Sequence, residues 1–222
     1  MKIEIKDIYK KYGSRPVLQG IDLAVEAGTC VGILGGNGCG KSTLLSILAG
    51  IQPADRGEFA IDGKDLFRYP RERSRLVGYV PQGTPLLEEL TAYDNLRLWY
   101  SKEELGKSLN GGMLQMLGVE KFLKMPVSKL SGGMKKRLSI GCAVSGRPPI
   151  LLLDEPMAAL DISCKQNISQ YIKNHKAMGG IVLMSSHDTL ELALCDQWYI
   201  MKEGKLTPFT YTGDLDELVK CL

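Results

Sequence analysis

The sequence has no apolar run long enough to cross a membrane and no hydrophobic leader. A bilayer span needs ~20 consecutive apolar residues, and no stretch of this chain approaches that length. Residues 1–6 alternate charge with isoleucine and do not form the apolar segment of a signal peptide. Both absences lead us to expect a chain that stays on the cytoplasmic side.

An excess of one charge and paired metal-binding cysteines are also lacking. The 28 Lys and Arg against 25 Asp and Glu give a formal net charge of +3, so no nucleic-acid partner is expected. None of the six cysteines forms a C-x-x-C pair and the two histidines are far apart in sequence, which excludes zinc-site spacing. Free thiols in a reducing compartment are the expectation.

The chain does have enough apolar material for a sizeable core, since 44% of its 222 residues are hydrophobic. Residues 3–25 alternate apolar and polar side chains, which is typical of strands. Helical segments separate a set of unbroken apolar runs, as in βαβ units, so an α/β fold is predicted. These runs lie at 29–34, 150–153 and 181–184. Hairpin turns are predicted at 62–63 and 203–204, and a closing helix from Asp214.

A glycine-rich segment directly after 29–34 fits the pattern G-x-x-x-x-G-K-[ST]. Glycines let the backbone turn sharply and aim its N–H groups at phosphate oxygens, and the following helix presents its positive end to the same anion. Lys41 would reach the β- and γ-phosphates, and the Ser42 hydroxyl can ligate Mg²⁺. The alternative is an ordinary strand-to-helix turn. The residues predicted to bind nucleotide here are Gly35, Gly36, Asn37, Gly38, Cys39, Gly40, Lys41, Ser42 and Thr43.

Two carboxylates follow the apolar run 150–153, where the end of a buried parallel strand would place a ligand. Asp154 is suited to hold Mg²⁺, directly or through water. Glu155 lies one residue further on, so its side chain can point elsewhere and orient or deprotonate an attacking water. The alternative is a strand end capped by solvated acids.

A third motif, Leu130-Ser131-Gly132-Gly133-Met134, precedes a basic helix. Ser131 can cap that helix, and the two glycines expose its first N–H groups, which makes a second anion site. Two phosphate-binding surfaces on one chain suggest that two chains share two nucleotides. The alternative is a simple capped helix start.

With these motifs in order, the chain closely resembles the ABC transporter ATPase family over nearly its whole length. Further positions match in order and spacing. Gln82 resembles the family's Q-loop glutamine, and residues 158–161, ending at Asp161, resemble its D-loop. His187 resembles the switch histidine. Tyr12 lies where the family has an aromatic residue that stacks on adenine, with Tyr9 as the alternative stacking residue.

The resemblance implies an α/β P-loop NTPase with a mainly parallel core sheet, an antiparallel β subdomain and a helical subdomain. It implies a single ABC ATPase domain over 1–222. The core and β subdomain would take 1–85 and 147–222, and the helical subdomain about 86–146. The β subdomain is expected to combine the N-terminal strands with residues 57–80.

The resemblance further implies that two subunits close head to tail around ATP and Mg²⁺. Each ATP would lie between Lys41 of one chain and Ser131, Gly132, Gly133 and Met134 of the other. The implied catalytic residues are Glu155, His187, Gln82 and Lys41, and the implied metal ligands are Ser42, Gln82 and Asp154. His187 would contact the γ-phosphate, and Asp161 would help to couple the two sites.

Three positions depart from the family pattern: Gly36 replaces a frequent Pro, Met134 a frequent Gln, and Ala158 the usual D-loop Ser. Gly36 is expected to loosen the loop, Met134 to remove a polar contact to the nucleotide, and Ala158 to weaken the coupling of the two sites. No residue with a direct catalytic role is replaced, so an active ATPase is expected.

The family works with a separate transmembrane permease, which implies a location on the inner face of the plasma membrane and a homodimer or heterodimer of ATPase subunits. A partner surface is predicted among Leu86, Leu87, Leu90, Tyr93, Leu98, Trp99 and Tyr100, the alternative being that these side chains pack the helical subdomain. Trp99 and Trp198 are expected mainly as packing residues and His175 as a solvated helix residue. Overall the sequence resembles ATPases of ABC-2-type exporters. A non-transport ATPase, such as an iron–sulfur assembly partner, and a nucleotide-binding module without turnover remain as alternatives.

Overall fold

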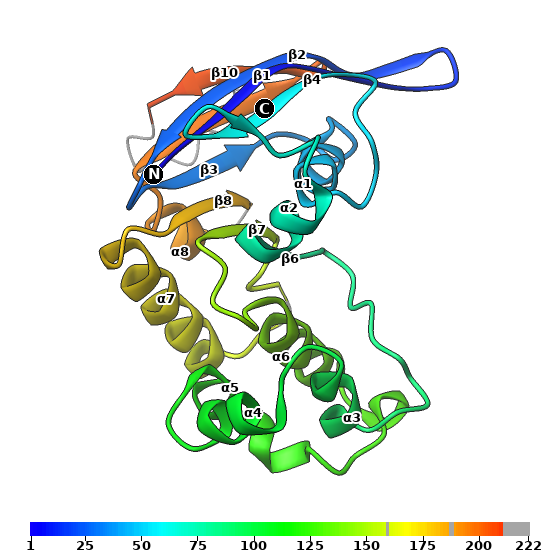
Figure 1. Ribbon diagram of the computed structural model, residues 1–222, viewed down its shortest axis with the longest axis vertical. Coiled ribbons are helices and arrows are strands. Elements are labelled where there is room, and N and C mark those ends of the chain that lie inside the picture. The colour runs from blue at the N-terminus through cyan, green and yellow to red at the C-terminus, as the bar shows by residue number, and fades with distance from the viewer. Residues whose placement is uncertain (159, 187–188, 211–222) are drawn as a thin grey trace.

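Two sheets form one end of the molecule and a group of short helices forms the other (Figure 1). The computed structural model describes residues 1–158, 160–186 and 189–210. The smaller sheet has the strand order β2-β1-β4-β5, with every pair antiparallel. Its strands are β1 (Lys2–Tyr12), β2 (Arg15–Glu26), β4 (Arg56–Ile61) and β5 (Lys64–Asp65).

The larger sheet contains the unbroken apolar runs of the sequence. Its strand order is β10-β9-β3-β8-β7-β6, and all neighbours pair parallel except the β9–β10 hairpin. Every residue of β3, β7 and β8 is buried, as expected for parallel strands covered on both faces. The strands are β3 (Cys30–Leu34), β6 (Val77–Val80), β7 (Ile150–Asp154), β8 (Ile181–Ser185), β9 (Gln197–Lys202) and β10 (Lys205–Phe209).

The side chains of β7 alternate between two hydrophobic cores. Ile150 and Leu152 belong to a core that includes α1 (Lys41–Ala49) and the smaller sheet. Leu151 and Leu153 belong to a second core, which includes the helical end and α7 (Ile162–Ala177). Successive side chains of a strand point to opposite faces, so the larger sheet separates the two cores.

The helical end, residues 92–143, is built from short elements, of which α3, α4 and α6 begin at a capping side chain. Thr91 and Ser101 each accept a hydrogen bond from a backbone N–H three residues on, and the acidic residue there bonds back. The elements are α3 (Ala92–Arg97), α4 (Lys102–Leu109), α5 (Met113–Met116), two 3₁₀ turns (Val119–Phe122 and Val127–Lys129) and α6 (Gly132–Ala143). Within the described ranges, no helix is both long and apolar enough to cross a bilayer.

Two of the predicted turns are confirmed and one strand was assigned to the wrong sheet. The turns at 62–63 and 203–204 close the β4–β5 and β9–β10 hairpins. The antiparallel subdomain was expected to extend through residue 80, but β6 pairs parallel with β7 in the larger sheet, Val77 opposite Ile150. Helix α2 (Pro70–Leu76) connects the two sheets and allows this change of layer. The helix expected from Asp214 lies outside the described residues.

The expectation of a solvated His175 was wrong, because α7 buries this side chain. Its Nε2 lies 3.2 Å from the Pro149 carbonyl oxygen, and a Cβ on Gly180 would overlap the ring. Burial lowers the pKa of His175, although the neighbouring backbone hydrogen bonds oppose this effect.

Folding should therefore become less stable as the pH falls from about 7.5 to about 5.5. In that window the unfolded chain binds a proton at His175 that the folded chain resists. In His175→Gln this part of the slope is absent. Urea unfolding across this pH window measures the free energy of unfolding of the wild type and of His175→Gln. The difference between the two pH slopes isolates His175, because the other titrating groups contribute equally to both. Identical slopes for the two proteins would contradict the burial argument.

Candidate active site

The phosphate loop connects β3 to α1 through positions that only glycine tolerates. Gly35, Gly38 and Gly40 have φ values of 153°, 77° and 116°. A Cβ on Gly35 would also lie 2.6 Å from Cys39 Sγ. No side chain caps α1, whose N-cap is Gly40. The first N–H groups of this helix therefore remain available to an anion.

Lys41 lies within this loop and not in solvent. The side chain is buried, and its Nζ donates to the carbonyl oxygens of Gly35 (2.5 Å) and Gly36 (3.3 Å). A buried ammonium is costly unless anions or acceptors surround it. The loop therefore combines a fixed positive charge with free N–H groups, which suits it to the terminal phosphates of a nucleotide.

The two predicted carboxylates lie at the carboxyl end of β7, beside β8. Asp154 is buried, and its Oδ1 accepts a hydrogen bond of 2.5 Å from Ser185 Oγ. Glu155 has a φ of 48°, unusual for a residue with a side chain. Such a backbone costs on the order of 1 kcal/mol. The backbone N–H of Glu155 donates to the Ser185 carbonyl oxygen and to Ser185 Oγ, both at 3.2 Å.

Gln82 meets Glu155 directly, although 73 residues separate them in sequence. The Nε2 of Gln82 donates to Oε2 of Glu155 over 3.1 Å. Gln82 follows β6, the edge strand next to β7. The parallel pairing thus brings two of the predicted catalytic side chains into contact.

The residues here are suited to a magnesium ion that is shared with phosphate. Mg²⁺ prefers oxygen ligands and is usually held by one or two protein groups together with substrate phosphates. Asp154 supplies a carboxylate and Ser42, in the first turn of α1, an exposed hydroxyl. In the part of the chain that the structure describes, no cluster of three or more His, Cys, Asp and Glu could hold a metal unaided. A protein-only cage is therefore not present among those residues.

The helix tip at Ser131 has the predicted cap. Its Oγ accepts from the Met134 N–H over 3.3 Å, as the first residue before α6. Ser131 and Gly132 are exposed. Asp161 caps α7 in the same way and accepts from the Cys164 N–H at 2.8 Å, a bond that lowers the pKa of Asp161. The sequence did not indicate this capping role.

Tyr12 and Tyr9 differ in what they contact. Tyr9 packs under the Arg56 guanidinium, 4.1 Å from the ring centroid, and its hydroxyl occupies the space beside Gly20. Tyr12 is exposed, and its hydroxyl donates to Gln52 Oε1. The accessible ring favours Tyr12 as the predicted adenine-stacking residue. His187 lies outside the described residues, so its role stays a prediction.

Two buried charged residues near the site were missed from the sequence, Glu191 and Lys136. Glu191 accepts from the Met157 N–H at 2.7 Å and from the Ser186 hydroxyl. It therefore links the segment after Glu155 to the segment before His187. The only sequence signal was an acidic residue within the apolar stretch 190–194.

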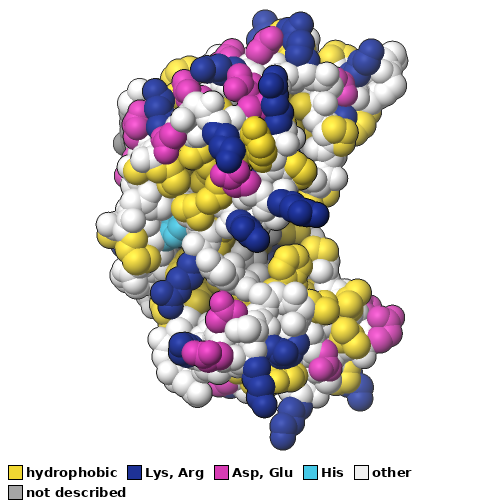
Figure 2. Space-filling view, in the orientation of Figure 1, with side chains coloured by type: hydrophobic (Ala, Val, Ile, Leu, Met, Phe, Trp, Pro, Cys, Tyr) yellow, Lys and Arg dark blue, Asp and Glu magenta, His cyan; other side chains and the backbone are white. Residues whose placement is uncertain are grey.

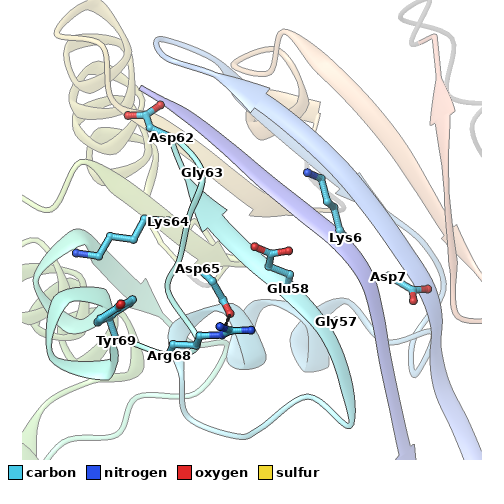
Figure 3. A pocket seen from close by; sticks show the side chains of 10 residues that line it. All are labelled: Lys6, Asp7, Gly57, Glu58, Asp62, Gly63, Lys64, Asp65, Arg68 and Tyr69. Carbon is cyan, nitrogen blue, oxygen red and sulfur yellow. Dashed lines mark ion pairs between the residues drawn. The ribbon is translucent and has the colours of Figure 1, made fainter.

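A cavity of about 780 Å³ lies over the smaller sheet, apart from these residues (Figure 3). Charged side chains dominate its lining, and Arg68 pairs there with Asp65 at 3.1 Å. The lining residues are Lys6, Asp7, Gly57, Glu58, Asp62, Gly63, Lys64, Asp65, Arg68 and Tyr69. None of them belongs to the predicted site.

A family profile described as "ABC transporter" matches residues 18–158, more than half of the chain. The chain belongs to the ABC transporter family. The match includes the phosphate loop, Gln82, the Ser131 tip and the two carboxylates. Membership in this family, the P-loop NTPase fold and the ATPase class predicted from the sequence are confirmed.

Curated members of the family resemble the chain over most of its length. The spermidine/putrescine import ATP-binding protein PotA of Bacteroides thetaiotaomicron is 36% identical, over 92% of this chain and 45% of that protein. The linearmycin resistance ATP-binding protein LnrL of Bacillus subtilis is 31% identical, over 96% of this chain and 70% of LnrL. The chain spans about half the length of the PotA proteins that it matches.

Solved ABC structures share the fold. One, described as an ATP-binding subunit of an ABC transporter, superimposes with a TM-score of 0.85 at 30% identity, covering 99% of this chain and 92% of its own. A second, the ATP-binding cassette MJ0796 as a dimer bound to ADP and Pi after hydrolysis, gives a TM-score of 0.82 at 28% identity. It covers 94% of this chain and 98% of its own.

Alkylation of Cys39 should abolish ATP binding, and ATP should protect the thiol. Its sulfur lies inside the phosphate loop, 4.0 Å from Lys41 Nζ, so an added group would fill the space that the phosphates need. The other described cysteines are buried. A Cys221→Ser background removes the remaining thiol. N-ethylmaleimide labelling followed by ATP titration measures the effect.

Cys39→Ser in the same background is the control and should bind ATP before and after treatment. Complete labelling of Cys39 with unchanged ATP affinity would show that the sulfur lies outside the phosphate position.

Proposed function

We propose that the chain binds ATP with Mg²⁺ and hydrolyses it as the subunit that powers a membrane transporter. The observation that carries the proposal is the contact of Gln82 with Glu155, at the strand end that also holds Asp154. Gln82 can position a water molecule there while the carboxylate of Glu155 takes a proton from that water. The phosphate loop, which follows β3 two strands away in the same sheet, supplies the anion site.

In the proposed reaction the loop N–H groups and Lys41 hold the β- and γ-phosphates. Glu155 accepts a proton from the attacking water while the oxygen of that water bonds to the γ-phosphorus. The bond between the γ-phosphorus and the β–γ bridging oxygen breaks, which yields ADP and phosphate. Gln82 orients that water, and His187 contacts the γ-phosphate. Bound Mg²⁺, held by Ser42 and Asp154, would neutralise charge on the phosphates. Thr43, beside Ser42, belongs to the same phosphate cradle.

We also propose that two chains enclose two nucleotides. In the tip formed by Ser131, Gly132 and Gly133, Ser131 and Gly132 are exposed, and the two glycines have no side chain to block an incoming phosphate. The dimeric MJ0796 cassette supports this arrangement by analogy. Met134 would face the partner's nucleotide without a polar contact, and Asp161 would lie near the junction. The second chain would be an identical copy or a related ATPase.

A separate permease would bind on the side where residues 81–91 connect the sheet to the helical end. Figure 2 shows that side of the molecule hollowed, with hydrophobic side chains on the lip formed by the helical end. Leu98 and Trp99 are 62% and 63% exposed, so the expectation that Trp99 packs internally was wrong. Tyr100 instead is buried, with its hydroxyl on the Gly141 carbonyl oxygen.

Large exposed apolar side chains that lie together mark an interaction surface. The proposed partner surface is therefore narrower than the sequence suggested and consists of Leu87, Tyr93, Leu98 and Trp99. Binding there would place the chain peripherally on the inner face of the plasma membrane.

Export is the proposed direction, supported by the likeness to LnrL over 96% of the chain. Import of polyamines is a second candidate, favoured by the PotA proteins. Stimulation of ATP hydrolysis in permease-containing vesicles separates them. Export predicts stimulation by a substrate added on the chain's own side, and polyamine import predicts stimulation by spermidine or putrescine from the opposite side.

Glu155→Gln should bind ATP with unchanged affinity, hydrolyse it ~10²–10⁴-fold more slowly and accumulate as an ATP-bound dimer, because only the proton acceptor is lost. Phosphate release and size-exclusion chromatography with ATP measure both effects. Glu203→Gln is a matched control, since Glu203 also has a positive φ (50°) but lies in the β9–β10 turn. Wild-type turnover by Glu155→Gln would rule out its role.

The double variant Leu98→Ser, Trp99→Ser should lose its permease but keep its ATPase activity in isolation, because these side chains contact solvent and not the nucleotide site. Tyr69→Ser, a change of a half-exposed aromatic residue beside α2, should keep both properties. Affinity purification from detergent-solubilised membranes measures the difference. Recovery of a soluble scaffold protein in place of a multi-span membrane protein would contradict the transport proposal.

A further inference from the structure

Lys136, in the second turn of α6, is only 4% exposed and directs its ammonium group at main-chain oxygens. Its Nζ donates to the carbonyl oxygens of Pro81 (2.9 Å), Gln82 (3.4 Å) and Asp154 (3.4 Å). Two of these carbonyls follow β6 and the third ends β7. A single side chain of the helical end thus joins both strand ends of the candidate active site.

The cost of burying this charge has to be offset by hydrogen bonds, because an ammonium without hydrogen-bond partners is strongly destabilising in a protein interior. The carboxylates of Asp154, Glu191 and Glu155 attract it, and desolvation outweighs them and lowers the pKa of Lys136. The contacts to backbone oxygens fix where those two segments lie relative to each other. They do not involve the loop around Lys41.

The position of Lys136 on α6 gives these contacts a second consequence. It lies five residues after Ser131, which is about 7.5 Å along the helix axis. In the proposed dimer, the Ser131 tip of α6 would face the partner's nucleotide. The same helix, one and a half turns later, contacts the segment that carries Gln82 in its own chain.

We propose that Lys136 is a positioning residue that fixes the start of the Gln82 segment against the end of β7 and so links α6 to the chain's own hydrolytic site. The inference rests on the proposed function. The side chain acts through Gln82 and Glu155 and does not touch the nucleotide. Gln82 Nε2 lies 3.1 Å from Glu155 Oε2, so a shift of the Gln82 backbone would change this contact.

Lys136→Met removes the three donated hydrogen bonds and keeps an unbranched side chain. We expect kcat for ATP hydrolysis to fall by up to ~10²-fold, the effect of misplacing a reacting group by about 1 Å, with the affinity for ATP unchanged. Hydrogen–deuterium exchange of the peptide 79–84 should become faster. Lys136→Gln, which retains N–H donors, should restore part of kcat and part of the protection.

Lys135→Met is the matched control. Lys135 is the preceding residue of α6 and pairs with Glu88 at 2.6 Å on the surface, so this variant should keep wild-type kcat and exchange. If Lys136→Met does not fold, Lys136→Gln and Lys135→Met carry the comparison. Unchanged kcat and exchange in both Lys136 variants would overturn the inference. So would a loss of kcat that only follows a lower melting temperature, without partial rescue by Gln.

The exchange measurement keeps this inference separate from the proposed function. A wild-type protein that does not hydrolyse ATP would contradict the proposed function. Faster exchange of 79–84 in Lys136→Met, absent in Lys135→Met, would still support the positioning role. Unchanged exchange would overturn that role whatever the wild type does.

Discussion

The parallel pairing of β3, β8, β7 and β6 is the constraint on which the candidate site depends. Parallel strands end at the same edge of a sheet, and ligands bind outside their carboxyl ends. The phosphate loop, Ser185, Asp154 and Gln82 lie at or just after the ends of four neighbouring strands, although they are spread over 150 residues of sequence. The register that places Leu153 opposite Met184 and Val80 therefore also sets the distances between the side chains of the candidate site.

Local patterns in the sequence were enough to predict the parts of the site that consist of consecutive residues. The phosphate loop requires glycine at positions of positive φ, and Ser131 caps its helix as its neighbours indicated. Family resemblance added Gln82, and its contact with Glu155 agrees with that assignment. His187 and the helix expected from Asp214 lie outside the described residues and remain predictions.

The sequence did not reveal features that depend on tertiary contacts. Lys136 can be buried because it donates to a distant main-chain carbonyl, and Glu191 because it accepts from a distant main-chain N–H. Every residue type presents such main-chain groups, so the sequence does not show where they lie. The strand β6 was assigned to the wrong sheet because a short apolar run does not indicate its partner. His175 is buried because Gly180 leaves room for its ring, and Trp99 is exposed because α3 ends just before it.

The alternation of β7 between two cores has a mechanical consequence. Leu151 and Leu153 belong to the core that includes the helical end, whereas Ile150 and Leu152 belong to the core that includes α1 on the opposite face. A rotation of the helical end, driven by the proposed membrane partner, would disturb only one of these two sets. The packing around the phosphate loop would then stay unchanged while the packing against the helical end rearranges, and the shared strand β7 would connect the two movements.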